Sequence, residues 1–171
     1  MNREKAKKIK ILITDVDGVL TNAMIGYGNY NDTYRQFNMQ DGFGLVLLKK
    51  TGIKTAIITG KSSRSLDRRA RELKFDLVCK DVEVKMKAFK KILKKFKLTP
   101  SEACYIGDDL LDLAVLKNAG LSVCVPEAPE ELKDTVDIVT KKSGGAGAVR
   151  EIIEFILKAQ DKWSDIVEKY L

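Results

Sequence analysis

Two aspartates stand one residue apart at the end of an apolar run, in the segment ILITDVDGVLTN (residues 11–22). Near a strand end, one of Asp15 and Asp17 could serve as nucleophile and metal ligand while the other gives and takes a proton. Gly18 allows a tight turn whose amides face a phosphate. The segment therefore predicts either a metal and phosphate site or, more simply, a strand that ends in an Asp-Gly turn.

A second acidic group occurs in YIGDDLLDLAVLKNAG (residues 105–120), where Asp108, Asp109 and Asp112 crowd a strand end and the first turn of a helix. The helix dipole alone would favour acidic residues there. Three carboxylates at the edge of a sheet also repel one another unless a cation compensates. A Mg²⁺ ion shared with Asp15 would resolve that repulsion.

The segment ITGKS (residues 58–62) resembles the end of a phosphate-binding P-loop, but Thr55 stands where the first glycine of that motif belongs. We expect the Thr59 hydroxyl and the Gly60 amide to hold phosphate oxygens, with Lys61 beside them. The alternative is a plain strand-to-helix turn with Ser62 as the helix cap. Lys85 alone is weak evidence for a phosphate site. Its only support is its place in the chain, between ITGKS and the second acidic group.

The composition narrows the chemistry further, because the chain of 171 residues has no histidine. Serine–histidine catalysis and histidine-bound zinc are therefore excluded, and carboxylate ligands indicate Mg²⁺ or a similar hard ion. The three cysteines fit buried apolar positions better than a disulfide framework or a zinc site. The net charge of +7 could indicate nucleic acid, but the lysines of residues 85–97 are spaced as the solvated face of an amphipathic helix.

Apolar runs that read as strands alternate with helical runs along the chain. This alternation predicts an α/β fold, a Rossmann-like three-layer arrangement with a mostly parallel central sheet. We expect strands at residues 8–16, 53–60, 75–80, 121–126 and 137–142, and a turn and helix start that lead into a further short strand within 99–109. We expect helices at 41–52, 62–74, 82–97, 110–120, 128–136 and 147–163. A β-hairpin insertion at about 23–38 is the one irregularity, and the chain reads as a single domain over 1–171 with a C-terminal helix and tail from about 146.

In parallel sheets of this kind, ligands bind beyond the carboxyl ends of the strands. Asp15, Thr59 and Asp108 each stand at the end of a different expected strand, so we expect them to meet at one edge. No apolar run approaches the length of a membrane span, and the basic N-terminus does not read as a signal peptide. We therefore expect a cytoplasmic protein.

These motifs, in this order, resemble the haloacid dehalogenase superfamily of phosphohydrolases over nearly the whole chain, with the hairpin as a minimal cap. The finer resemblance is to the 3-deoxy-D-manno-octulosonate 8-phosphate (KDO 8-phosphate) phosphatases. It rests on DVDGVLTN, FNMQDGFGLVLL, IITGKSS, KMKAF, YIGDDLLDLAVL, GLSVCVPEAPEEL and GGAGAVREIIEFIL. The resemblance implies hydrolysis of KDO 8-phosphate in lipopolysaccharide precursor synthesis, and a homotetramer in which a neighbouring subunit completes each active site.

The resemblance also implies a role for each site residue. Asp15 would attack phosphorus to give an aspartyl-phosphate, and Asp17 would protonate the leaving sugar oxygen and then activate water. Asp15, the backbone carbonyl of Asp17, and Asp108 would hold Mg²⁺. Thr59, Gly60 and Lys85 would bind the phosphoryl group, and Asp109 and Asp112 would support the metal site. The residues that would contact the sugar are Asn38, Met39, Gln40, Asp41, Gly42, Lys61 and Arg69.

Gln40, Lys61 and Ala146 depart from the family pattern, because arginine is common at all three positions. Lysine cannot make the bidentate contact to a carboxylate that arginine makes. The alternative substrates are therefore a nonulosonate 9-phosphate or other sugar phosphates. A non-catalytic oligomerisation module of the same fold is a further alternative, although Asp15, Asp17, Lys85 and Asp108 are all present.

Overall fold

One parallel sheet forms the centre of the molecule, which we describe from a computed structural model covering residues 2–29 and 33–171. Within those ranges the sheet has six strands in the order β5-β4-β1-β6-β7-β8, and every neighbouring pair is parallel. The strands are β1 (Ile11–Thr14), β4 (Lys54–Ile58), β5 (Leu77–Cys79), β6 (Ala103–Gly107), β7 (Leu121–Cys124) and β8 (Ile138–Val139). The predicted α/β fold with a mostly parallel sheet is confirmed.

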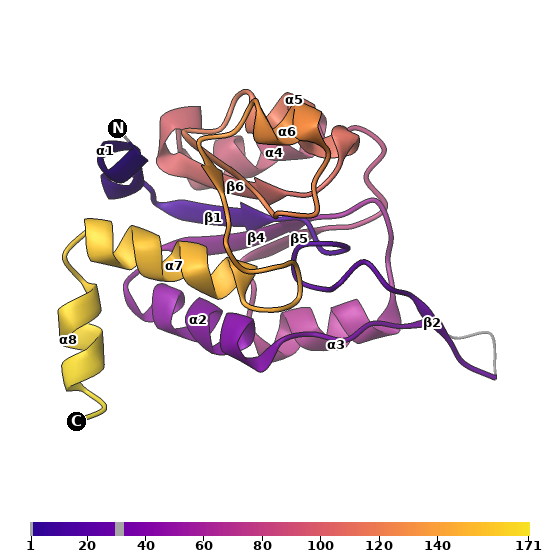
Figure 1. The fold of residues 1–171 in the computed structure, drawn as a ribbon, viewed down its shortest axis with the longest axis horizontal. Coiled ribbons are helices and arrows are strands. Elements are labelled where there is room, and N and C mark those ends of the chain that lie inside the picture. Colours follow the sequence, from indigo (N-terminus) through magenta and orange to yellow (C-terminus); the bar gives the residue numbers. More distant parts are fainter. Residues whose placement is uncertain (1, 30–32) are drawn as a thin grey trace.

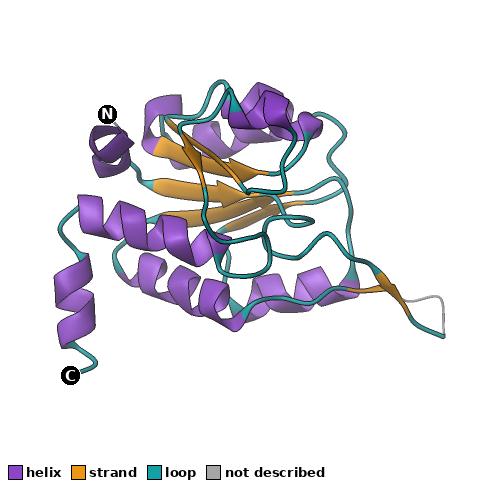
Figure 2. Cartoon of the chain, viewed as in Figure 1, coloured by secondary structure: helices purple, strands orange, loops and turns teal. Residues whose placement is uncertain are grey.

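Helices cover both faces of this sheet (Figures 1 and 2). One face carries α4 (Lys85–Phe96), α5 (Leu113–Leu116) and α6 (Glu130–Lys133), and the other carries α2 (Met39–Lys50), α3 (Arg64–Glu72) and α7 (Ala148–Ala159). The shorter elements are α1 (Asn2–Lys7), α8 (Trp163–Glu168) and the 3₁₀ helices η1 (Pro100–Glu102) and η2 (Leu110–Asp112).

The alternation of side chains along β1 creates a core on each face. Ile11 and Ile13 pack on the side of α4, whereas Leu12 packs on the side of α2 and α7, and all three are fully buried. β1 pairs with β4 on one side and β6 on the other. The strand that leads into Asp15 is therefore packed against helices on both faces and hydrogen-bonded to a strand on both edges.

The hairpin lies beyond the carboxyl end of the sheet and projects from the body of the molecule (Figure 1). Its strands, β2 (Gly26–Tyr27) and β3 (Thr33–Tyr34), are antiparallel and only two residues long. The expected hairpin at about 23–38 is confirmed in this part, although residues 30–32 lie outside the described ranges.

Several boundaries differ from the expected ones. α2 begins at Met39 because the Asn38 side chain accepts hydrogen bonds from the amides of Gln40 and Asp41, 2.7 and 3.2 Å away. Ser63, not Ser62, caps α3. The helix expected at 110–120 is divided into η2 and α5, and the one expected at 147–163 ends at Ala159.

Two terminal helices complete the fold. α1 was not predicted; it packs against α7 and buries Ala6 completely. In α8, Ile166 is buried and Arg150 lies over the Trp163 ring, 5.3 Å from its centroid. None of the helices in the described ranges combines the length and apolarity needed to cross a bilayer.

Candidate active site

Asp15 follows β1 directly and is buried, with 7% of its surface exposed. The chain then turns sharply, because the Val16 carbonyl accepts hydrogen bonds from the amides of Leu20 and Thr21, at 3.0 and 3.1 Å. Gly18 has a φ of +85°, and a Cβ at this position would lie 2.0 Å from Oδ2 of Asp108. The DxDG pattern therefore needs glycine for two reasons, its backbone conformation and the close approach of the β6 loop.

Lys85, the first residue of α4, connects the two acidic segments. Its Nζ lies 2.9 Å from Oδ2 of Asp15 and 2.7 Å from Oδ1 of Asp112, and the side chain is 5% exposed. Burial by itself lowers the pKa of this ammonium group, but the carboxylates of Asp112 and Asp15 outweigh burial and raise the pKa above its usual value. Lys85 therefore remains a cation beside Asp15.

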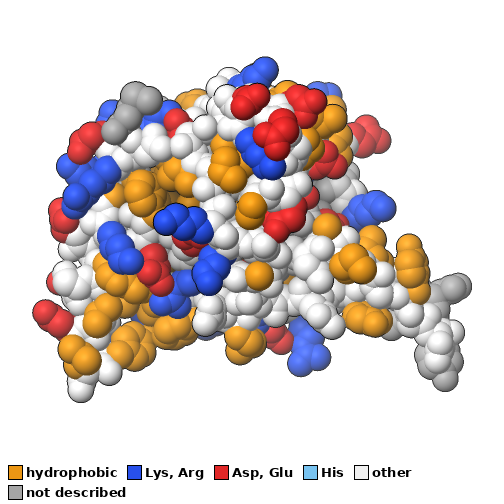
Figure 3. All heavy atoms as spheres, viewed as in Figure 1, with side chains coloured by type: hydrophobic (Ala, Val, Ile, Leu, Met, Phe, Trp, Pro, Cys, Tyr) orange, Lys and Arg blue, Asp and Glu red, His pale blue; other side chains and the backbone are white. Residues whose placement is uncertain are grey.

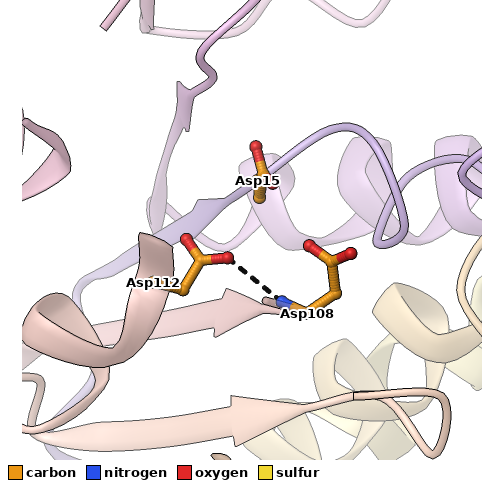
Figure 4. A group of neighbouring side chains, drawn as sticks. All are labelled: Asp15, Asp108 and Asp112. Atoms are coloured by element: carbon orange, nitrogen blue, oxygen red, sulfur yellow. Dashed lines mark hydrogen bonds between the residues drawn. The ribbon is translucent and has the colours of Figure 1, made fainter. Parts of the chain in front are cut away.

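Asp112 is fully buried and is held by four protein donors. One oxygen accepts from Lys85 and from the Tyr105 hydroxyl. The other accepts from the amides of Asp108 and Asp109, at 3.1 and 3.4 Å, and Figure 4 shows the first of these bonds. With both oxygens occupied, Asp112 positions Lys85 and the loop after β6.

A cation fits between Asp15 and Asp108. Oxygen atoms of Asp15, Asp108 and Asp112 all lie within 4.8 Å of one another (Figure 4). Burial first, and then repulsion from the neighbouring carboxylates, raises the pKa of Asp15 to about 6 and that of Asp108 to about 8. Such crowded carboxylates match the all-oxygen donor set that Mg²⁺ prefers.

These groups open into a cavity of about 470 Å³ at the carboxyl end of the sheet. Eight of the residues that line the cavity are site residues predicted from the sequence, and the other five are not. The lining residues are Asp15, Asp17, Ala23, Ile25, Thr59, Gly60, Lys61, Val82, Glu83, Lys85, Asp108, Asp109 and Leu111.

Thr59 lies just beyond β4 and lines the same cavity as the acidic groups. Its side chain is almost completely buried, and its hydroxyl accepts a hydrogen bond of 3.3 Å from the Lys61 amide. The Lys61 side chain extends into solvent at the rim. The β4 loop thus presents a hydroxyl and a cation to the same space as Asp15 and Lys85.

The segment Asn38–Gly42 and Arg69 contact each other but do not line this cavity. The Arg69 guanidinium donates to the Asn38 carbonyl at 3.2 Å, and a Cβ on Gly42 would lie 2.1 Å from its Nη2. Asp41 is buried and accepts a bond of 2.7 Å from the Arg150 amide, at the start of α7. Met39 and Gln40 are exposed. The role of this group in binding sugar stays a prediction.

Two residues at the site were missed in the sequence. Arg35, just after β3, forms two parallel hydrogen bonds to Asp17, from Nε to Oδ1 at 2.5 Å and from Nη2 to Oδ2 at 3.0 Å. The hydrogen bond that Arg35 donates to Asp17 raises the pKa of Arg35. Tyr105 was read only as part of a buried strand. The sequence from Thr33 to Phe37 carries no signal that distinguishes Arg35 as buried, although the structure buries it between two exposed neighbours.

Comparison with known proteins agrees with this geometry. Residues 44–120 match the haloacid dehalogenase-like hydrolase family. The KDO 8-phosphate phosphatase of Escherichia coli K12 is 39% identical over 158 residues, which are 92% of this chain and 84% of that protein. The Yersinia pestis enzyme is 39% identical over 93% of this chain and 85% of its own length.

Solved structures of KDO 8-phosphate phosphatases are also similar to this chain. The KDO 8-phosphate phosphatase of Moraxella catarrhalis, in complex with magnesium, phosphate and KDO, superposes with a TM-score of 0.97 at 40% identity, over 99% of this chain and 98% of its own. The cobalt-bound enzyme of Haemophilus influenzae has a TM-score of 0.90 at 37% identity over 94% of each chain. Because the sequence identity with these relatives holds over nearly the whole chain, the protein belongs to the KDO 8-phosphate phosphatase family of haloacid dehalogenase-like hydrolases.

Proposed function

We propose that this chain is a Mg²⁺-dependent phosphatase that hydrolyses KDO 8-phosphate to KDO and inorganic phosphate. The observation that carries the proposal is the buried Asp15 carboxylate, 2.9 Å from Lys85, facing a cavity that also contains Thr59 and Asp108. The Moraxella relative, whose crystals contain magnesium, phosphate and KDO, supports the choice of substrate.

The reaction begins at Asp15. One Asp15 oxygen attacks phosphorus, the bond between phosphorus and the sugar oxygen breaks, and Asp17 gives its proton to that oxygen. Asp17 then takes a proton from water as the water oxygen attacks phosphorus and the bond between phosphorus and the Asp15 oxygen breaks, which releases phosphate and leaves Asp15 as a carboxylate and Asp17 protonated. Both side chains line the same cavity, as this division of roles requires.

Positive charge and hydrogen-bond donors balance the phosphoryl oxygens. Lys85 and the Thr59 hydroxyl line the cavity with the Gly60 backbone, and all three can face a phosphoryl group bound at Asp15. Asp15, the Asp17 carbonyl and Asp108 would hold Mg²⁺, with Asp109 and Asp112 in support. Bound there, the ion would neutralise developing charge on the phosphoryl group.

Recognition of the sugar acid depends on a second set of residues. We propose that Lys61, Arg69 and the segment Asn38–Gly42 contact the sugar within the assembled protein. Gln40, Lys61 and Ala146 stand where relatives often have arginine. For this reason a nonulosonate 9-phosphate, or another sugar phosphate, is the competing substrate in the test below.

We further propose a homotetramer in which the hairpins meet and a neighbouring subunit helps to close each site. Figure 3 shows hydrophobic side chains gathered on the projecting hairpin. Met24, Tyr27 and Tyr34 are 70%, 80% and 53% exposed there. Exposed apolar side chains concentrated on one small projection favour burial against another protein surface. The cytoplasmic location stays a prediction.

The test is phosphate release from purified protein, with KDO 8-phosphate compared against a nonulosonate 9-phosphate and simple sugar phosphates. We expect the highest kcat/KM for KDO 8-phosphate and loss of turnover with a chelator, restored by Mg²⁺. Asp15→Asn, purified identically, is the control for contaminating phosphatases. Absence of turnover for every substrate with Mg²⁺, or full turnover by Asp15→Asn, would contradict the proposal.

A further inference from the structure

The hairpin holds Asp17 through Arg35, and no other side chain in the described ranges bonds to that carboxylate. The two hydrogen bonds, 2.5 and 3.0 Å long, join Nε and Nη2 of Arg35 to the two oxygens of Asp17. This parallel arrangement fixes the plane of the carboxylate as well as its position.

Arg35 differs from an ordinary surface cation. Its side chain is only 2% exposed, whereas the Asp17 side chain is 30% exposed and open to the cavity. Within the described residues its remaining nitrogen, Nη1, is buried without a partner. A guanidinium buried in this way, with its two bonding nitrogens on one carboxylate, is placed to orient that carboxylate.

Asp17 needs such support because its position in the chain provides little. Asp15 is fixed by a core strand and by Lys85, but Asp17 lies two residues further on, in the turn before Gly18. We propose that Arg35 is a positioning residue, which aims the Asp17 carboxyl group at the oxygen of the leaving sugar. This inference rests on the proposed function, in which Asp17 is the general acid and base.

The alternative is that Arg35 only anchors the hairpin to the body of the molecule. The two roles predict different responses to the leaving group. Departure of a sugar alkoxide needs a proton from Asp17, whereas nitrophenolate departs without one. Since kcat/KM reports the steps up to departure of the leaving group, loss of positioning should affect a sugar phosphate far more than p-nitrophenyl phosphate.

The experiment therefore measures kcat/KM for KDO 8-phosphate and p-nitrophenyl phosphate in Arg35→Gln and Arg35→Lys. We expect a fall of about 30- to 100-fold for the sugar phosphate and less than about 3-fold for the nitrophenyl ester. Arg35→Lys keeps the charge but loses the paired bonds, so it should recover only part of the loss. Arg68→Gln, which removes an exposed arginine paired with Glu72 on α3, is the matched control and should change neither value.

A double variant separates positioning from anchoring even if the hairpin is disturbed. In an Asp17→Asn background, Arg35→Gln should lower kcat/KM for the sugar phosphate by less than about 2-fold, because the group it positions is already absent. Equal losses on both substrates, or a further tenfold loss in that background, would overturn the inference. If the wild-type protein hydrolyses neither substrate, the proposed function itself fails and this inference fails with it.

Discussion

The two sides of the cavity are built differently. On the sheet side, Asp15, Lys85 and Asp112 are buried, and each is bonded to at least one of the others. On the hairpin side, Asp17 depends on Arg35, which follows a strand of two residues. One side is therefore supported by the hydrophobic core, and the other by a single pair of hydrogen bonds.

This difference corresponds to the division of chemical labour. In the proposed mechanism, Asp15 attacks phosphorus and Lys85 balances its charge, and both gain from rigidity because their hydrogen bonds must already be in place when charge develops. In the same proposal, Asp17 is the acid and base and must instead meet a leaving group that enters and leaves the cavity. In the proposed tetramer, a neighbouring subunit would supply the support that the single chain lacks there.

The largest effect should come from removing the cation on the sheet side. In Lys85→Met, the carboxylates of Asp15 and Asp112 lose their shared partner while remaining buried. We expect phosphatase activity to fall by about 10³-fold or more and the metal-free protein to lose about 3–5 kcal/mol in its free energy of unfolding. Phosphate release and urea denaturation measure the two quantities.

Lys90→Ala is the matched control, because Lys90 is exposed on the same helix. This variant should change the free energy of unfolding by no more than about 0.5 kcal/mol, and the phosphatase rate by no more than the factor that corresponds to that free energy. Arg35→Gln should be less destabilising than Lys85→Met, since the Asp17 carboxylate that it leaves is partly solvated. Equal destabilisation by these two variants would contradict the contrast between the sides.

Asp108→Asn should have the opposite effect on the stability of the metal-free protein. The pKa of Asp108 is raised to about 8 in the folded chain, first by burial and then by repulsion from Asp15 and Asp112. Above pH 4 the unfolded chain releases this proton while the folded chain retains it, so stability falls as pH rises toward 8. The asparagine variant lacks this loss and should be more stable near pH 8 by about 1–3 kcal/mol, discounted for partial exposure.

Thermal unfolding between pH 5 and 8, with chelator and with Mg²⁺, tests this prediction. The advantage of Asp108→Asn should shrink as pH falls, and Mg²⁺ should raise the melting temperature of the wild-type protein but hardly that of the variant. Asp134→Asn, which changes an exposed carboxylate directly after α6, should follow the wild-type curve. A destabilised Asp108→Asn at pH 8 without metal would be inconsistent with repulsion at this site.

The sheet side of the site could be predicted from sequence because its signals are independent. The alternation of strands and helices predicts a parallel sheet, and the carboxyl ends of parallel strands must meet at one edge. Asp15, Thr59 and Asp108 each follow a separate strand, so their convergence did not depend on any long-range contact being guessed. Lys85 was the weakest of these signals, and only its order in the chain distinguished it from other lysines.

The hairpin side could not be predicted to the same depth. Strands of two residues have too little periodicity to show which side chains point inward, and Arg35 looked like any hairpin arginine. The role of Asp41 in sugar binding stays a prediction, and the sequence did not show that its carboxylate accepts a hydrogen bond from the Arg150 amide once α2 begins at Met39. Tyr105 was hidden for another reason, because only the fold brings its hydroxyl to Asp112.

The smallest effect on the folded chain should come from an exposed tyrosine in strand β2 of the hairpin. Tyr27 is 80% exposed, so Tyr27→Ser should change the free energy of unfolding by no more than about 0.5 kcal/mol. If the hairpins meet in a tetramer, the same change removes a large apolar contact from each of them. We therefore expect light scattering at micromolar concentration to show a shift from tetramer toward smaller species.

Tyr170→Ser provides the matched comparison, because Tyr170 is 58% exposed at the opposite end of the molecule and contacts Phe43. It should leave the assembly intact, which separates a contact made by the hairpin from a general loss of surface tyrosine. A lower kcat/KM in the dissociated Tyr27→Ser protein would further show that the hairpin side of the cavity needs a neighbour. A wild-type protein that is already monomeric, or a Tyr27→Ser tetramer as stable as the wild type, would mean that the hairpin side is complete within one chain.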